Sequence, residues 1–310
     1  MTHRLAILFV LPALLLAACA TPQGAPGLLD RVERLRTDRP EQAGTMAAFL
    51  DRTMARLCGA DCNRPALTDA RLLDLAAAAA AVNAYHPGLR VEAHERVFAA
   101  LLARGLAGPL EVRELHRTYI AARRWEDARR LVGRFPELAL EPIPATIDPG
   151  PAPGGHPAVW RVSQVEDAIH REPLDLSRGR VLIVISHPGC GPSRRALAAL
   201  REPALRDRLP ARTYFVVPPL GSIDIPRLRH WNAEFPTQEH RFADREGDWP
   251  FGHRIWDMPT FVLLEEGVHR ATLQGWPPGT EQGERLKALL EAEQGETGQG
   301  EAGRGVAGAQ

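Results

Sequence analysis

The sequence predicts a chain of two domains: an all-α helical domain, followed by an α/β domain with a central mixed sheet flanked by helices. Three observations support this prediction. In the first part of the chain, apolar residues recur at helical spacing among many Ala and Arg residues. In the second part, strand-like apolar runs alternate with helical segments, which is typical of an α/β domain. Between them, Pro and Gly gather in residues 141–157, which we interpret as a linker.

The first 18 residues have the features of an export signal. A short basic start is followed by an apolar stretch over residues 5–16 that Pro12 interrupts. This stretch is too short to span a bilayer comfortably. Its order of basic and apolar segments is that of a signal peptide.

The stretch "LAAC", Leu16 to Cys19, resembles the lipobox of bacterial lipoproteins. The resemblance implies that residues 1–18 are removed, that Cys19 carries lipid, and that residues 19–27 form a short tether. Ala20 follows the cysteine, which in such lipoproteins favours the outer membrane, facing the periplasm. The alternative is a soluble exported protein cleaved near the same position. The lipoprotein interpretation places the protein in the bacterial cell envelope.

The helical domain is predicted over residues 28–140. A helix from about Thr45 ends near Cys58, where Gly59 and a tight loop follow. The segment "LTDARLLDLAAAAAAVNAY" opens at Thr68 as an N-cap, and "RVEAHERVFAALLARG" closes at Gly105. Short antiparallel helix pairs are therefore expected.

The segment "LEVRELHRTYIAARRWEDARRLVGRF" resembles a single tetratricopeptide repeat. The residues that carry the resemblance are Leu115, Tyr119, Trp125, Ala128 and Val132. His116 stands where the repeat has a small residue. Core packing is the preferred interpretation of these residues, with a peptide-binding groove as the alternative.

Export allows disulfides to persist, so the four cysteines can be assigned roles. With Cys19 lipidated, Cys58 and Cys62 lie four positions apart in "RLCGADCNRP" and are expected to pair. A metal site is poorly supported there, because no histidine follows at ligand spacing. Cys190 is left as a single thiol, and the alternative is that Cys58 or Cys62 serves as its resolving thiol from the other domain.

The α/β domain is predicted over residues 158–293, and the tail over residues 294–310 is expected to be disordered. The predicted strands are "AVWRVS", the unalternating and therefore buried "VLIVIS", "TYFVVPP", "PTFVLLEE" and "VHRATLQGW". The predicted helices are "QVEDAIHRE", "CGPSRRALAALRE", an inserted helix in "IDIPRLRHWNAEFP", and "GERLKALLEAE".

This domain resembles the thioredoxin fold. Cys190-Gly191-Pro192-Ser193 stands where thioredoxins carry Cys-Gly-Pro-Cys, directly after the central strand, and Met258-Pro259-Thr260 stands where they have their cis-proline. The resemblance implies that Cys190 is a nucleophile, with Ser193 and Pro259 in its active site. It also implies that Met258 and Thr260 contact an extended substrate.

The position of Cys190 has a physical consequence of its own. A cysteine at the first turn of a helix faces unpaired N–H groups and the positive end of the helix dipole. Its thiolate is therefore stabilised and should be reactive. A second possible stabiliser is His187, as an imidazolium. The alternative for His187 is a loop histidine without a partner.

Two departures from the family change the expected chemistry. Ser193 replaces the second cysteine, and a hydroxyl cannot attack a mixed disulfide to release the partner. Val184 stands where thioredoxins bury an acidic residue. A third difference is Gly189, which replaces the usual Trp and is expected to widen access to Cys190. A peroxiredoxin assignment fails at His187 and Ile183, and a copper-chaperone assignment fails for want of a second nearby cysteine.

Two functions are left open. In the first, Cys190 forms mixed disulfides or assists disulfide exchange in exported client proteins, with release by a client thiol or an external reductant. In the second, the protein is a non-catalytic binding or scaffold lipoprotein. The 38 acidic residues balance the 38 basic residues and no long basic run is present, so a nucleic-acid partner is not expected. No cofactor or metal is expected either. The lipid on Cys19 would supply the contact with the membrane.

Overall fold

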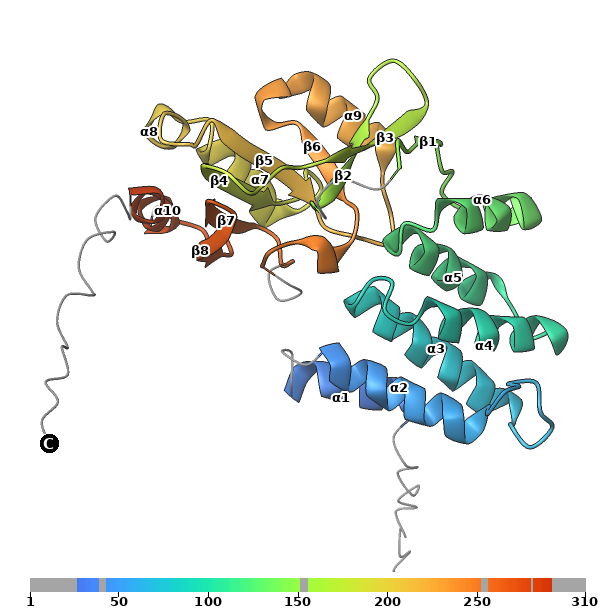
Figure 1. The fold of residues 1–310 in the computed structure, drawn as a ribbon. Coiled ribbons are helices and arrows are strands. Elements are labelled where there is room, and N and C mark those ends of the chain that lie inside the picture. Colours follow the sequence, from blue (N-terminus) through green and yellow to red (C-terminus); the bar gives the residue numbers. More distant parts are fainter. Residues whose placement is uncertain (1–26, 39–42, 151–155, 252–255, 280, 292–310) are drawn as a thin grey trace, which may run out of the picture.

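The computed structural model describes residues 27–38, 43–150, 156–251, 256–279 and 281–291. The predicted signal peptide, Cys19, most of the predicted tether and the predicted disordered tail lie outside these residues. Figure 1 shows a group of helices in the first part of the chain and a sheet with further helices in the second. The described chain is therefore a mixed α/β protein with a helical N-terminal region.

The N-terminal region consists of helices that pack against their neighbours along the chain. They are α1 (Leu28–Asp38), α2 (Ala43–Leu57), α3 (Asp69–Tyr85), α4 (Val91–Ala103), α5 (Pro109–Ala121) and α6 (Trp125–Arg134), followed by the 3₁₀ turn η1 (Pro136–Leu138). Thr68 is the N-cap of α3, as predicted: its hydroxyl accepts a hydrogen bond from the Arg71 N–H at 3.4 Å. Apolar faces of α1 to α4 enclose one core, which includes the fully buried Leu50, Leu72 and Leu75.

The second region is built on an eight-stranded mixed sheet in the order β1-β3-β2-β6-β5-β4-β7-β8. Its strands are β1 (Ala145–Ile147), β2 (Ala158–Val162), β3 (Ala168–Pro173), β4 (Arg180–Ile185), β5 (Arg212–Val217), β6 (His240–Ala243), β7 (Thr260–Glu265) and β8 (Val268–Gln274). Strands β4, β5 and β6 run parallel, while β7 and β8 are antiparallel to their neighbours. The predicted antiparallel pair after Pro259 is β7 and β8.

Three strands were not predicted, and one of them replaces a predicted helix. Residues 164–172 were expected to form a helix, but Ala168–Pro173 is strand β3, which pairs antiparallel with β2. The turn between the strands is closed by the Ser163 hydroxyl, which accepts hydrogen bonds from two following backbone N–H groups. Pairing with β2 and burial of Ile169 override the local helical pattern. Strand β1 lies inside the predicted linker, and β6 follows the predicted inserted helix.

The helices of the second region cover one face of the sheet. They are α7 (Gly191–Ala199), α8 (Pro203–Arg206), α9 (Ile225–Glu234) and α10 (Glu281–Glu291), and the short 3₁₀ turns η3 (Pro236–Gln238) and η4 (Glu246–Asp248) lie near β6. Alternate residues of β4 point to opposite faces. Leu182 and Val184 pack with α7 and α10, whereas Ile183 and Ile185 pack with residues of strands and loops, among them Trp249. Both faces are buried, as predicted for "VLIVIS", but one of them is covered by loops and not by helices.

The two regions share a core. Trp125 of α6 packs edge-on against Trp160 of β2, with ring centroids 5.5 Å apart. Arg123 is buried, and its Nε donates to the Ala243 carbonyl oxygen at 2.9 Å. The Glu141 carboxylate accepts hydrogen bonds from two backbone N–H groups just before α9. The helical region is therefore docked on the same face of the sheet that α9 covers.

Candidate functional site

Cys190 lies between the central strand β4 and helix α7. It is the N-cap of α7, with extended backbone at φ −85° and ψ 125°. Its N–H donates to the His187 carbonyl oxygen at 2.9 Å, which closes a tight turn after the strand. The thiol is free and partly exposed. Strand β4 therefore delivers Cys190 to the N-terminus of a helix, where backbone N–H groups have no partner within the helix.

The loop before β7 lies beside this thiol. Cys190 Sγ is 4.0 Å from the Met258 carbonyl oxygen, and the Met258–Pro259 peptide bond is cis. The register places Thr260 opposite Ile185, so antiparallel pairing of β4 and β7 holds the loop at Cys190. Thr260 is fully buried and its hydroxyl donates to the Asp257 carbonyl oxygen at 2.7 Å. Of the two residues predicted to contact substrate, Met258 is partly exposed and Thr260 is not.

Ser193 has no exposed surface. Its Oγ accepts a hydrogen bond from the His187 N–H at 3.3 Å, one turn of α7 below Cys190. Val184 is also fully buried and belongs to the apolar core beneath α7. Residue 193, where the resemblance to thioredoxins led us to look for a second thiol, is a hydroxyl that supports the loop, and residue 184, where it led us to look for a buried acid, is apolar.

A buried polar pair, which the sequence did not predict, lies at the end of β4. Ser186 Oγ is 2.8 Å from His240 Nε2, and His240 Nδ1 is 2.9 Å from the Gln238 carbonyl oxygen. Because Nδ1 must donate to that carbonyl, Nε2 accepts from the Ser186 hydroxyl. Burial lowers the pKa of His240 to about 3, so the ring is neutral. No pattern in the sequence predicted strand β6, so nothing indicated that His240 would lie in the sheet beside Ser186.

His187 is not an imidazolium at neutral pH. Burial lowers its pKa, and the positive charge of Arg227 lowers it further. Its Nδ1 accepts a hydrogen bond from the Gly189 N–H at 2.9 Å, which requires an unprotonated nitrogen there. The geometry therefore gives His187 a role in shaping the turn, and it does not support the proposed charge stabilisation of Cys190.

Gly189 does not leave an open approach to Cys190. A Cβ at this position would lie 2.8 Å from Arg227 Nη1 and 2.8 Å from His187 Nδ1. The space that was expected to widen access is occupied by these two side chains. Arg227 comes from α9, and its Nε donates to the Asp224 carboxylate at 2.6 Å. The inserted helix was predicted, but the contact of its Arg227 with the loop before Cys190 depends on the fold.

The predicted pairing of Cys58 and Cys62 is confirmed, because the two sulfurs form a disulfide. Both residues are buried in the core that α1 to α4 enclose. Cys190 lies in the other region of the molecule, at the sheet. In this arrangement neither helical cysteine is a partner for Cys190.

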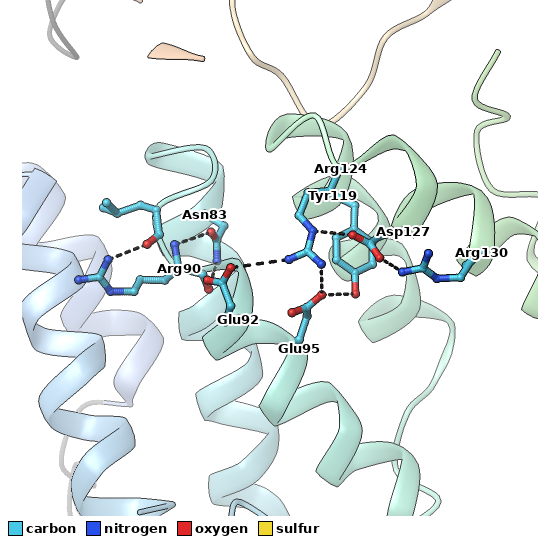
Figure 2. Close-up of polar contacts among 9 residues, drawn as sticks. Asn83, Arg90, Glu92, Glu95, Tyr119, Arg124, Asp127 and Arg130 are labelled. Carbon is cyan, nitrogen blue, oxygen red and sulfur yellow. Dashed lines mark hydrogen bonds and ion pairs between the residues drawn. The ribbon is translucent and has the colours of Figure 1, made fainter. Parts of the chain in front are cut away.

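The residues with tetratricopeptide-like spacing lie mainly in a core. Leu115, Tyr119, Trp125 and Ala128 are buried, and Val132 is partly buried against the same cluster. Figure 2 shows how charged side chains hold these helices together. Arg124 pairs with Glu95 at 3.1 Å and with Asp127 at 2.5 Å. Glu95 also accepts a hydrogen bond from the Tyr119 hydroxyl at 2.9 Å, and burial beside this carboxylate raises the pKa of Tyr119.

Beside this network lies a groove of about 530 Å³ between α4, α5 and α6. Phe98, Leu102 and Leu131 contribute apolar surface to it, and Arg130 and Arg134 lie at its exposed edge.

Within the described residues, no group of three or more His, Cys, Asp or Glu side chains is arranged to hold a metal ion. No helix in the described ranges is long and apolar enough to cross a membrane.

These observations define a mixed α/β protein with a helical N-terminal region and a single free thiol, among the described cysteines, at a helix N-terminus. In comparisons with known proteins, no protein-family model, curated protein or solved structure matches the chain.

Proposed function

We propose that this chain is an envelope-anchored, thioredoxin-like protein whose single thiol, Cys190, forms mixed disulfides or assists disulfide exchange in exported client proteins. The observation that carries the proposal is the placement of Cys190. Its thiol is partly exposed at the N-terminus of α7, directly after the central strand and 4.0 Å from the Met258 carbonyl oxygen. Helix-terminal N–H groups favour the thiolate, which is the attacking species.

The proposed reaction is thiol–disulfide exchange. The Cys190 thiolate attacks one sulfur of a client disulfide, an S–S bond forms to Cys190, and the client's own S–S bond breaks. The client's other sulfur leaves as a thiolate and takes a proton from water. The client disulfide is the oxidant, and Cys190 is oxidised to the mixed disulfide. Release requires a second thiol from the client or an external reductant, because the Ser193 hydroxyl cannot resolve the bond.

Mixed disulfides on Cys190 should therefore be long-lived. Wild-type protein on non-reducing gels should show higher-mass adducts that a reductant removes and that are absent from Cys190→Ala. Insulin reduction with dithiothreitol should be little above background. The Cys58–Cys62 disulfide, measured by mass spectrometry, is the internal control and should be intact in both proteins. A Cys190 that does not react with a neutral thiol probe in the folded protein would overturn the proposal.

The second candidate is a binding or scaffold lipoprotein without redox chemistry. The groove between α4, α5 and α6 favours it, since this groove has an apolar floor and a basic edge. One measurement distinguishes the two candidate functions. Alkylation of Cys190 should abolish disulfide exchange if the first candidate is correct, and should leave partner capture unchanged if the second is correct.

The envelope location in the proposal depends on Cys19. Replacing Cys19 with Ser should move the protein from the membrane fraction to the soluble fraction, since the lipid chains on this residue would be the anchor. Fractionation of cells that express the full chain measures this. A Cys19→Ser protein that remains with the membrane would show that the anchor lies elsewhere.

A further inference from the structure

Helix α9 brings a cation to the residue that precedes Cys190. Arg227 Nη1 lies 2.8 Å from the position of a Cβ on Gly189. The Asp224 carboxylate holds the guanidinium through Nε at 2.6 Å, and the Arg227 side chain is 52% exposed. One edge of the guanidinium is therefore anchored, while the other lies at the surface beside the thiol loop.

Two further arginines follow the thiol on α7. Arg194 and Arg195 are exposed in the first turns of this helix, and Arg195 donates to the Trp276 carbonyl oxygen at 3.1 Å. The carboxylates on the adjoining segments are Asp224, which is paired with Arg227, and the exposed Asp257. Arg194, Arg195 and Arg227 thus outnumber Asp224 and Asp257 in these segments of the chain, and the N-terminus of α7 adds further positive potential.

We propose that Arg227 makes Cys190 selective for anionic disulfides, meaning those with a carboxylate near the reacting sulfur. The inference rests on the proposed function of Cys190 and deepens it by naming a substrate class. A carboxylate on the incoming disulfide would lie against the guanidinium while the Cys190 thiolate attacks the neighbouring sulfur. A neutral disulfide lacks this contact with the guanidinium, so its rate should not depend on the Arg227 charge in this way.

The experiment compares two small disulfides with the full-length protein. Dithiobis(nitrobenzoate) carries a carboxylate on each half, and dithiodipyridine is neutral. The rate of Cys190 modification is measured with each probe at low and high salt, for the wild type, Arg227→Gln and Arg227→Lys. Arg52→Gln is the matched control, because Arg52 is an exposed arginine of α2 in the other region.

Arg227→Gln should lower the rate with the anionic probe roughly threefold at low salt, and leave the rate with the neutral probe unchanged. Arg227→Lys should keep most of the preference, because the charge remains. Arg52→Gln should change neither rate. In the wild type, salt should slow the anionic probe alone. The salt dependence of the wild type tests the preference for an anionic disulfide even if a variant fails to fold.

The two possible failures are distinguishable. If both probes modify Cys190 and the ratio of their rates is insensitive to salt and to Arg227→Gln, the selectivity is wrong and the proposed function stands. If neither probe modifies Cys190, the proposed function fails and the selectivity fails with it.

Discussion

The two cysteine environments of this protein differ in burial and in partner. Cys58 and Cys62 lie at the end of α2, four positions apart, and their disulfide is enclosed by the core of α1 to α4. Cys190 lies after the end of β4, partly exposed, with the buried hydroxyl of Ser193 one turn further along α7. The first pair is near in sequence and closed to solvent. Cys190 is partly exposed and has no partner thiol among the described residues.

This difference shows how the surroundings of a sulfur separate a structural role from a reactive one. A buried disulfide between nearby residues restricts the unfolded chain and is protected from exchange. The Cys190 thiol is free and partly exposed, so it is available for exchange. The predictions below test whether the two regions respond as differently as their cysteines suggest.

The largest expected effect is a loss of folding stability at acidic pH. It should occur in both regions, because each contains a buried histidine. Burial lowers the pKa of His94 in α4 to about 4 and that of His240 in β6 to about 3. Unfolded histidines protonate near the ordinary pKa of about 6.5, so below this pH the unfolded state binds more protons and the folded state loses stability. The loss should continue as pH falls from about 6.5 towards 4.

Between about pH 7 and pH 5, each of these two histidines should destabilise the fold by on the order of 1 to 2 kcal/mol. Urea unfolding followed at both pH values measures this loss. Because the regions share a core, one cooperative transition is expected at each pH. Two separate transitions would show that the regions unfold independently. Stability that is the same at both pH values would contradict the burial of neutral histidines.

The disulfide of the helical region should matter for stability only. Replacing both Cys58 and Cys62 with Ala removes a cross-link that closes a short loop, so the free energy of unfolding should fall by about 2 kcal/mol, at the low end for disulfides. Thermal and chemical unfolding measure this change. The matched control is Cys190→Ala, whose unfolding should be nearly unchanged. An equal loss from Cys190→Ala would remove the distinction between the two environments.

The smallest expected effect comes from adding a second thiol next to Cys190, so that this site, like the Cys58–Cys62 pair, has two cysteines. Ser193→Cys supplies a resolving thiol, so mixed disulfides on Cys190 should be released faster and insulin reduction should rise several-fold. The gain should be modest, since Val184 offers no proton acceptor. Ser193→Ala is the control, because it alters the same buried position without a thiol. Adducts that persist as long in Ser193→Cys as in the wild type would show that residue 193 cannot reach the mixed disulfide.

Local patterns in the sequence were sufficient for much of this structure. Thr68 and the apolar spacing after it predicted where α3 begins, because a cap and a helical stripe depend on neighbours within a turn or two. The unbroken run of "VLIVIS" predicted a strand buried on both faces. Cys58 and Cys62 could be paired because they are close in the chain. The Cys-Gly-Pro-Ser stretch placed Cys190 at the start of a helix.

The tertiary structure decided what depends on contacts between distant segments. Strand β3 forms where a helix was predicted, because pairing with β2 and burial of Ile169 outweigh local preference. His240 meets Ser186, and Arg227 meets Gly189, across 54 and 38 positions of the chain, and no short pattern encodes such a meeting. The charge state of His187 was also beyond the sequence. It is set by desolvation and by a cation from another element, and both exist only once the chain has folded.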